Sequence, residues 1–283
     1  MPIYQVVVLA VVQALTEFLP VSSTAHLALV PWLLKWHDPG LTFDVALHLG
    51  TLTAVLAYFW RLWIRLVFAG FGLTPPLGPA ATSQHPDPDA AVADRRLLWL
   101  LALGTVPAGV VGYAFEHYVR GALRSPYVMA ASMILVALLM AYGERVSRQL
   151  RGLKDMGLSD SILVGCAQAV ALIPGVSRSG ITITAAMIRD FRRDSAARFS
   201  FLLATPVVAG ASAKEGFGLL RAGIPADMRL PFLLGMAIAA LVGYGVIAFF
   251  IRYLQTRTLK IFIYYRLIFG VIILGLATFS SAP

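Results

Sequence analysis

Long apolar segments constrain this chain more than any other feature of its sequence. Hydrophobic residues make up 59% of the 283 residues and charged residues only 13%, against about 25% in a typical soluble domain. A water-soluble fold of this size would need a more charged surface. The sequence therefore predicts an all-α integral membrane protein. About six apolar segments come close to the roughly 20 residues that a helix needs to cross a bilayer, and they are 41–60, 97–115, 125–143, 199–217, 230–251 and 261–279.

Three local features refine this expectation. Pro206 interrupts the segment 199–217, where a kink would be tolerated. The stretch 70–94 is rich in proline and glycine and predicts an exposed loop, the one long linker of the chain. Cys166 is the single cysteine, which excludes an internal disulfide and a thiolate metal cluster. No Lys or Arg precedes the first apolar stretch, so we expect it to remain in the mature protein rather than be cleaved as a signal peptide.

Two further apolar segments, 2–34 and 159–190, are each broken midway by a turn rich in Ser, Pro and Gly. Their halves are too short to cross a bilayer alone. Each segment therefore predicts a re-entrant helical hairpin, which returns to the side of the membrane from which it entered.

The two hairpins resemble each other in sequence. Aligning Gln13 with Gln168 also aligns Ser22 with Ser177, which indicates a weak internal repeat. Three crossings separate the two copies, and an odd number inverts the second one. We expect an inverted-topology repeat within one membrane domain, with the site midway between its halves. The halves are residues 1–158, which include the exposed loop, and residues 159–283.

The distribution of charge predicts the orientation. A formal net charge of +9 would suggest nucleic acid as a partner of a soluble protein, but the basic residues form short clusters between apolar segments, so no nucleic acid is expected. Most Lys and Arg fall in the loops on the side opposite the N-terminus. Because cytoplasmic loops carry the excess of Lys and Arg, both termini and the entrance of the first hairpin are expected to face the exterior.

The broken hairpins indicate an anion site. Irregular backbone at membrane depth is tolerated only where protein buries it or a wet cavity solvates it. Each turn precedes a helix, whose free N–H groups and positive end favour an anion. Arg178 adds a planar donor fork suited to phosphate oxygens, and its cost in a membrane, at least about 2.5 kcal/mol, favours a functional role. The hydroxyls and small residues of the turns would add further contacts, although close helix packing explains several of them singly as well; these residues are Ser22, Thr24, Ser177, Ser179 and Gly180.

Glu17 is the second costly residue of the hairpins. It shares a helical face with Gln13, and His26 lies beyond the turn. A carboxylate beside phosphate oxygens suits a hard cation, so Mg²⁺ or Ca²⁺ is expected, with Glu17 and Gln13 as candidate ligands. His26 could act as a general acid, a general base or a nucleophile, and the alternative is a packing histidine.

Three other polar residues lie in spanning segments. Asp44 and His48, four residues apart, could line the mouth of the cavity, although Asp44 could equally be solvated at the membrane interface. Arg266 is interpreted as a residue that snorkels to the interface or pairs helices.

These residues stand in two motifs that resemble those of the bacterial undecaprenyl pyrophosphate phosphatases, the membrane family associated with bacitracin resistance. The first motif is (E/Q)xxxE followed by PVSSTxH, here QALTE at 13–17 and PVSSTAH at 20–26. The second is PGxSRSxxT, here PGVSRSGIT at 174–182. The resemblance implies hydrolysis of undecaprenyl diphosphate to undecaprenyl phosphate and inorganic phosphate, outside the bacterial plasma membrane, which recycles the lipid carrier for cell-wall synthesis.

The resemblance also implies roles for individual residues. Glu17, with Gln13, would bind metal or assist acid–base chemistry, and Arg178 would hold the diphosphate. Either Ser23 or His26 would be the attacking group or its activator, and the sequence does not choose between them. Gly175 and Thr182 belong to the second motif and are implied to contact the substrate.

Gln13 departs from the glutamate that many relatives carry and leaves Glu17 as the single motif carboxylate. We therefore expect Glu17→Gln to abolish hydrolysis and Gln13→Glu to be tolerated.

A different class of protein suits the same pattern. Inverted repeats with broken helices are common in transporters, so a polyprenyl-phosphate transporter or flippase is the alternative. An enzyme would release inorganic phosphate in detergent micelles, where a pure transporter would not. The Ala- and Gly-rich helix faces allow a homodimer, but they could equally pack within one chain.

Overall fold

The structure is a computed structural model that describes residues 1–37, 39–73, 95–115, 123 and 125–279. Over these residues the chain is all-helical, with eleven α-helices and one short 3₁₀-helix, η1 (Leu153–Asp155). Most of the loop expected at 70–94 lies outside the described residues.

Among the described residues, five helices are long and apolar enough to cross a membrane, and a bent pair of helices makes a sixth candidate. The bent pair changes direction by 75° at Phe59. The expectation of about six spans is therefore confirmed as five or six. The five are α5 (Arg95–Ala114), α7 (Pro126–Val146), α10 (Arg193–Ala222), α11 (Ala226–Thr256) and α12 (Lys260–Phe279), and the pair is α3 (Gly40–Tyr58) with α4 (Trp60–Gly70).

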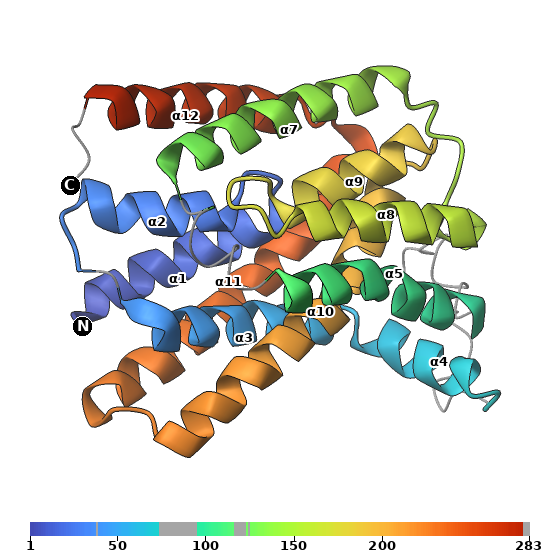
Figure 1. Ribbon diagram of the computed structural model, residues 1–283. Helices are drawn as coiled ribbons and strands as arrows, with labels where there is room; N and C mark the ends of the chain where they lie inside the picture. Colours follow the sequence, from blue (N-terminus) through green and yellow to red (C-terminus); the bar gives the residue numbers. More distant parts are fainter. Residues whose placement is uncertain (38, 74–94, 116–122, 124, 280–283) are drawn as a thin grey trace.

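Four shorter helices form two helical hairpins. They are α1 (Ile3–Phe18) with α2 (Ser23–Leu33), and α8 (Leu158–Val170) with α9 (Arg178–Ile188). Figure 1 shows the hairpins entering from opposite ends of the molecule, α1–α2 from the end with the N-terminus and α8–α9 from the other, so that their connecting turns meet near the middle.

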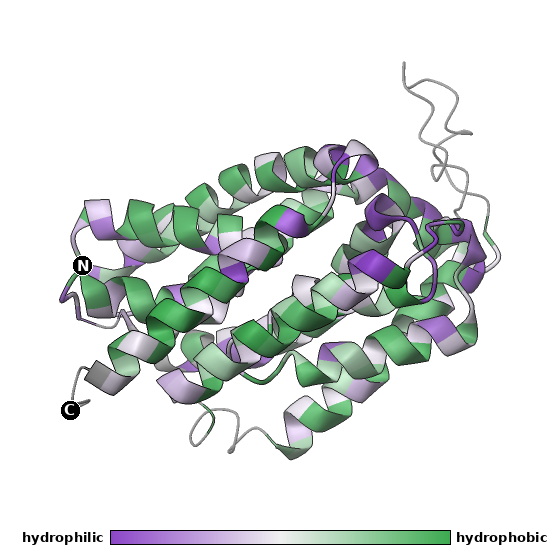
Figure 2. Ribbon diagram, turned by 90° about the horizontal axis from the view of Figure 1, so that it is seen from above, coloured by the Kyte–Doolittle hydropathy of each residue, from purple (hydrophilic) through white to green (hydrophobic). Residues whose placement is uncertain are grey.

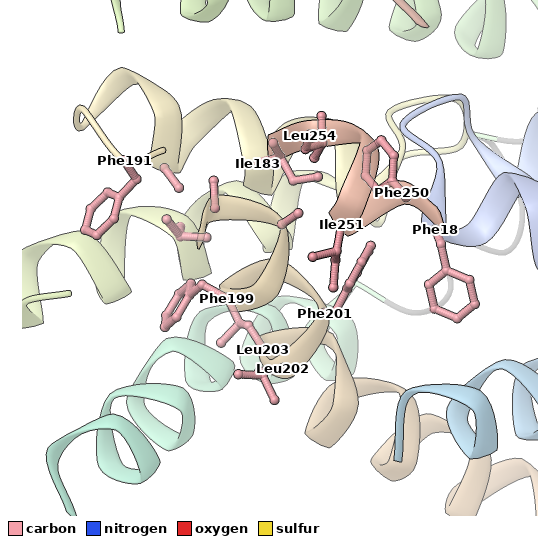
Figure 3. Close-up of a cluster of buried hydrophobic side chains, with 14 of the residues drawn as sticks. Phe18, Ile183, Phe191, Phe199, Phe201, Leu202, Leu203, Phe250, Ile251 and Leu254 are labelled. Atoms are coloured by element: carbon pink, nitrogen blue, oxygen red, sulfur yellow. The ribbon is translucent and has the colours of Figure 1, made fainter. Parts of the chain in front are cut away.

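The helix α10 lies at the centre of the main apolar core, among α3, α5, α9 and α11. Phe18, the last residue of α1, meets Phe201 of α10 edge to face with ring centroids 5.4 Å apart, and Phe201 lies beside Phe250 of α11. These rings are drawn in Figure 3. Since aromatic pairs add to the free energy of burial, this packing holds the tip of the first hairpin against the centre of the bundle.

The second hairpin is held by close backbone contact. A Cβ atom on Gly165 of α8 would lie 2.2 Å from the carbonyl oxygen of Gly104 on α5. Small residues at such a crossing let membrane helices approach closely without cavities. Each hairpin is thus fixed against long helices.

The outer surface is apolar over the length of the helices. Large side chains such as Tyr113 and Leu241 are 85% and 77% exposed. In a bilayer these side chains face lipid. Figure 2 shows the densest group of hydrophilic residues at the end of the molecule away from the N-terminus.

Candidate active site

The two hairpin turns have the same unusual backbone. Ser22 has φ 76° and ψ 98°, and Ser177 has φ 70° and ψ 114°. Positive φ is rare and strained for residues other than glycine. Each serine is bonded to a hydroxyl two residues on, Ser22 Oγ to Thr24 Oγ1 at 3.1 Å and Ser177 Oγ to Ser179 Oγ at 3.3 Å. Strain repeated at matching positions indicates that the surrounding structure imposes this shape.

The turns are hydrogen-bonded to each other. The Gly175 N–H donates to Thr24 Oγ1 at 3.3 Å, and the Ser179 hydroxyl donates to the carbonyl of Leu19 at 3.2 Å. Residues more than 150 positions apart therefore form one polar unit, from which α2 and α9 both begin.

Arg266 of α12 supports both turns. Its guanidinium donates to the carbonyls of Pro20, Gly175 and Val176, at 3.3, 3.0 and 3.0 Å. It also donates to two carbonyls of α7, and the residue is 0% exposed. Of the two interpretations of Arg266, helix pairing is therefore confirmed and snorkelling to the interface is wrong, because backbone carbonyls of α7 and of both turns satisfy its donors inside the bundle. The sequence indicates such a role, because Arg266 stands in the middle of an apolar span. The argument made for Arg178, that an arginine in a membrane is too costly to lack a role, applies equally to Arg266.

Glu17 joins three other polar side chains. Its Oε2 accepts from the Ser23 hydroxyl at 2.6 Å and from Gln13 Nε2 at 3.2 Å, and its Oε1 lies 3.1 Å from Arg178 Nη2. The side chains of Glu17 and Arg178 are 10% and 23% exposed. Four predicted site residues from both hairpins thus meet at one carboxylate.

This carboxylate borders a cavity between α1, α3, α9 and α10. The cavity has a volume of about 20 Å³, about that of one water molecule. Its polar lining is formed by Glu17, Arg178, Ser179, Thr51, Ser200 and Thr205. The sequence analysis did not predict Thr51, Ser200 and Thr205, because single hydroxyl residues in apolar spans belong to no motif.

His26 lies on another side of the first turn. Its Nδ1 is 2.7 Å from the carbonyl oxygen of Ser22, which identifies Nδ1 as the protonated nitrogen, and its Nε2 is 2.5 Å from the Tyr265 hydroxyl. The ring stacks on Phe269, with centroids 4.4 Å apart. Within the described residues, no hydrogen bond joins His26 to Ser23 or to Glu17. The proton acceptor in contact with Ser23 is therefore Glu17.

The remaining residues of the second motif shape the turn. Thr182 Oγ1 donates to the Arg178 carbonyl at 2.7 Å and is bonded to Ser200 Oγ at 2.6 Å. The Gly180 N–H donates to Ser177 Oγ at 3.2 Å. Gly175 has φ +90°, and a Cβ there would lie 2.5 Å from a backbone oxygen of α7. In this structure the Thr182 hydroxyl and the Gly180 N–H are bonded within the protein, and Ser179 is the hydroxyl of the second motif that lines the cavity.

Asp44 and His48 lie on the first turns of α3. The His48 Nδ1 is 2.8 Å from the Asp44 carbonyl oxygen. Neither residue is in the lining of the cavity at Glu17.

The residues fit a divalent cation only in part. The described residues contain no group of three or more His, Cys, Asp or Glu side chains that could hold a metal ion. Glu17 supplies one carboxylate, and the Oε1 of Gln13, also in the described part, is buried without a hydrogen-bond partner. Mg²⁺ often takes one or two protein oxygens and completes its shell with substrate phosphate and water, which these two residues permit.

An arginine, a carboxylate and a hydroxyl, gathered where two helices begin inside an apolar bundle, define a multi-pass membrane protein with a site for phosphoryl chemistry. The chain belongs to the BacA family. The family model described as bacitracin resistance protein BacA matches residues 6–272.

Curated relatives resemble the chain over its whole length. The undecaprenyl-diphosphatase of Thermomicrobium roseum is 43% identical over 287 aligned residues, covering 99% of this chain and 100% of that protein. The undecaprenyl-diphosphatase of Geotalea daltonii is 44% identical and covers the same shares. That of Pelotomaculum thermopropionicum is 40% identical over 98% of this chain and 97% of its own length.

Proposed function

We infer that this chain is an undecaprenyl-diphosphatase, a membrane phosphatase that hydrolyses undecaprenyl diphosphate to undecaprenyl phosphate and inorganic phosphate. The observation that carries this conclusion is the cluster of Glu17, Ser23 and Arg178, which combines a proton acceptor, a nucleophile and a phosphate-binding cation. Similarity over nearly the whole chain to proteins named for this activity supports it.

Arg178 binds the diphosphate in this proposal. Its Nη2 faces Glu17, while its Nη1 is buried without a hydrogen-bond partner among the described residues. An unsatisfied buried donor is costly, so a phosphate oxygen at Nη1 is favoured. The positive ends of α2 and α9 add to this field.

Ser23 is the attacking group. As its Oγ forms a bond to the terminal phosphorus, its proton moves to Glu17 Oε2, 2.6 Å away. The bond between that phosphorus and the bridging oxygen breaks, and the lipid monophosphate leaves with the bridging oxygen. Glu17 then passes that proton to the departing monophosphate. Water attacks the phosphorus of the seryl phosphate and gives its proton to Glu17, the bond between phosphorus and Ser23 Oγ breaks, and Glu17 returns the proton to Oγ as inorganic phosphate is released.

His26 positions the first turn. Attack by His26 would require its unprotonated Nε2, which already accepts a hydrogen bond from Tyr265. The Nδ1–H instead holds the carbonyl of Ser22, the residue before Ser23.

A divalent cation, Mg²⁺ or Ca²⁺, would be held by Glu17 and Gln13. When bound, it would neutralise charge on the diphosphate. The buried Gln13 Oε1 supports this assignment.

The two hairpins are re-entrant and form an inverted-topology repeat of residues 1–158 and 159–283. One constant sequence offset relates Ile3 to Leu158, Ser22 to Ser177, and the start of α2 to that of α9. The matching φ angles of the serines and the opposite directions of the hairpins in Figure 1 support the relation.

The excess of Lys and Arg at the end opposite the N-terminus supports a cytoplasmic location for that end. Both termini and the active site then face the exterior.

Release of inorganic phosphate by purified protein in detergent micelles tests the activity. Wild type is expected to release phosphate from undecaprenyl diphosphate, and Arg178→Ala to lose at least about 100-fold. If correctly folded wild type released no phosphate, the assignment as an enzyme would be wrong and a transporter would be favoured. Micelles do not separate two compartments, so transport cannot be mistaken for hydrolysis in this assay.

A second experiment identifies the attacking group. With substrate labelled in its terminal phosphate, rapid acid quenching is expected to trap acid-stable phosphoserine, which Ser23→Ala abolishes. Acid-labile label that persists in Ser23→Ala and disappears in His26→Ala would overturn the assignment.

A further inference from the structure

A second concave site lies far from the catalytic cluster in sequence and at the basic end of the bundle. It is a groove of about 530 Å³ where the end of α7 meets the beginnings of α10 and α12. None of its residues belongs to the two motifs or to the cavity at Glu17. The lining residues are Ala141, Glu144, Arg145, Arg193, Thr258, Lys260, Ile263, Tyr264 and Leu267.

Within the described part of the chain, the groove carries an unbalanced positive charge. Its single acidic residue, Glu144, is neutralised by Arg193, whose Nε lies 3.0 and 3.1 Å from the two carboxylate oxygens. The side chains of this pair are only 7% and 17% exposed. Arg145 and Lys260 are exposed, and within the described residues neither side chain has an ion pair or hydrogen bond. The groove therefore presents two cations without a protein counter-ion.

Helix stability explains only one of these cations. Arg145 lies in the last turn of α7, where a positive charge complements the helix dipole. Lys260 is the first residue of α12, where the dipole disfavours a cation. An anionic ligand in the groove would offset that cost.

Apart from Thr258 and Tyr264, the rest of the lining is apolar and extends along α7 and α12. Ile263 and Leu267 lie one turn apart on α12, and Ala141 lies one turn before Arg145 on α7. Tyr264 is 63% exposed and amphipathic, as is typical of residues at the level of lipid headgroups. Cations at one end and an apolar floor at the other match a phosphate headgroup with an acyl chain.

We propose that this groove binds an anionic glycerophospholipid of the surrounding bilayer, with its phosphate between Arg145 and Lys260 and an acyl chain along Ile263 and Leu267. Charge complementarity selects this occupant over zwitterionic phospholipid, since basic pockets between membrane helices favour anionic headgroups.

Native mass spectrometry of detergent-purified protein tests the proposal directly. The protein is titrated with phosphatidylglycerol and, separately, with phosphatidylcholine of the same acyl chains. Wild type is expected to retain phosphatidylglycerol preferentially, and the double variant Arg145→Gln/Lys260→Gln to bind it about tenfold more weakly. The matched control is Lys154→Gln/Arg252→Gln, which removes one Lys and one Arg, both exposed, from outside the groove.

Binding to the control variant should equal that of wild type. Equal losses in both double variants would show a general charge effect and overturn the site, as would equal retention of the two phospholipids by wild type. Preferential displacement of phosphatidylglycerol by undecaprenyl phosphate would overturn the assigned occupant in favour of the lipid carrier. Phosphate release is expected to be unchanged in the double variant, so the binding result stands apart from the test of the enzyme.

Discussion

At the scale of single residues, Glu17 is where the two hairpins meet chemically. Its two oxygens face Ser23 and Gln13 from its own hairpin and Arg178 from the other. In the proposed mechanism, this one carboxylate orients Ser23, accepts its proton and holds Arg178 before substrate arrives. Preorganised charge of this kind is the main source of rate acceleration in phosphoryl transfer.

Replacing Glu17 by glutamine tests this convergence. An amide of the same size cannot accept the Ser23 proton and no longer balances Arg178, so phosphate release should fall by at least about 100-fold. Gln13→Glu, which restores the second carboxylate of the family motif, should keep turnover. The assay is phosphate release by purified variants whose melting temperatures are measured in parallel. Wild-type turnover by Glu17→Gln would remove the carboxylate from the mechanism.

Arg266→Lys probes the support beneath both turns. An ammonium has three donors and no planar fork, so it cannot serve the five carbonyls that the guanidinium reaches. Unsatisfied buried carbonyls should cost about 2–4 kcal/mol in total, seen as a lower melting temperature in detergent, together with a loss of phosphate release. Arg252→Gln, at an exposed position, is the control. Full activity in Arg266→Lys would show that the turns hold their shape without it.

The sequence predicted those site residues that stand in local motifs. Glu17 and Arg178, which the structure brings together, were singled out because charge is costly at membrane depth, and Ser23 because it stands in the family motif. Tyr265 and the role of Arg266 were missed, because their partners lie far away in the chain and are largely backbone carbonyls. A carbonyl oxygen is present at every residue, so the sequence does not show which carbonyls a buried arginine binds.

At the scale of elements, the base of the second hairpin is closed by one aspartate. Asp160, in the first turn of α8, accepts from Arg151 Nη2 at 2.5 Å, from Arg189 Nε at 2.8 Å and from the Gly157 N–H at 3.0 Å. Arg189 follows the last residue of α9, so the carboxylate joins the entry and exit of the hairpin. Burial alone would raise the pKa of Asp160, but these donors hold the pKa below its ordinary value.

This lowered pKa predicts an acid-dependent loss of stability. Because the folded pKa lies below the unfolded one, the contribution of Asp160 is complete above about pH 4 and disappears as the pH falls through the folded pKa. Asp160→Asn should lower the melting temperature at pH 7, and the difference from wild type should shrink as the medium is acidified below pH 4. A difference that stays constant with pH would show that ionisation of Asp160 does not stabilise the hairpin.

Hydropathy predicted the long helices, but it did not predict the helix α4 or the continuity of α10 at Pro206. No helix was predicted between residue 60 and the loop at 70–94, whereas the structure has α4 there, an amphipathic helix that buries Leu66 and leaves Arg61 exposed. A helix with one polar face falls below the hydropathy of a full span. The α10 helix continues through Pro206 without a break, because neighbouring helices can satisfy the freed backbone groups.

At the scale of the whole molecule, the directions of the hairpins and the distribution of basic residues define the same axis. The hairpins enter from opposite ends, while the basic residues gather mainly at the end where α8 begins. If that end is cytoplasmic, the lipid groove at Arg145 and Lys260 lies in the inner leaflet. The active site, by contrast, belongs to the middle of the bundle, where the turns meet.

The orientation can be measured with cysteine labelling in cells. Cys166 is exposed and must first be replaced by alanine. In that background, Lys35→Cys, after α2, and Lys154→Cys, in η1, place single thiols at exposed positions near opposite ends. If the basic end is cytoplasmic, a membrane-impermeant maleimide should label Lys35→Cys in intact cells and Lys154→Cys only after permeabilisation. The reverse pattern would put the active-site entrance of the first hairpin in the cytoplasm. It would also contradict outward-facing hydrolysis, because the diphosphate would then be presented to Glu17 and Arg178 from inside the cell.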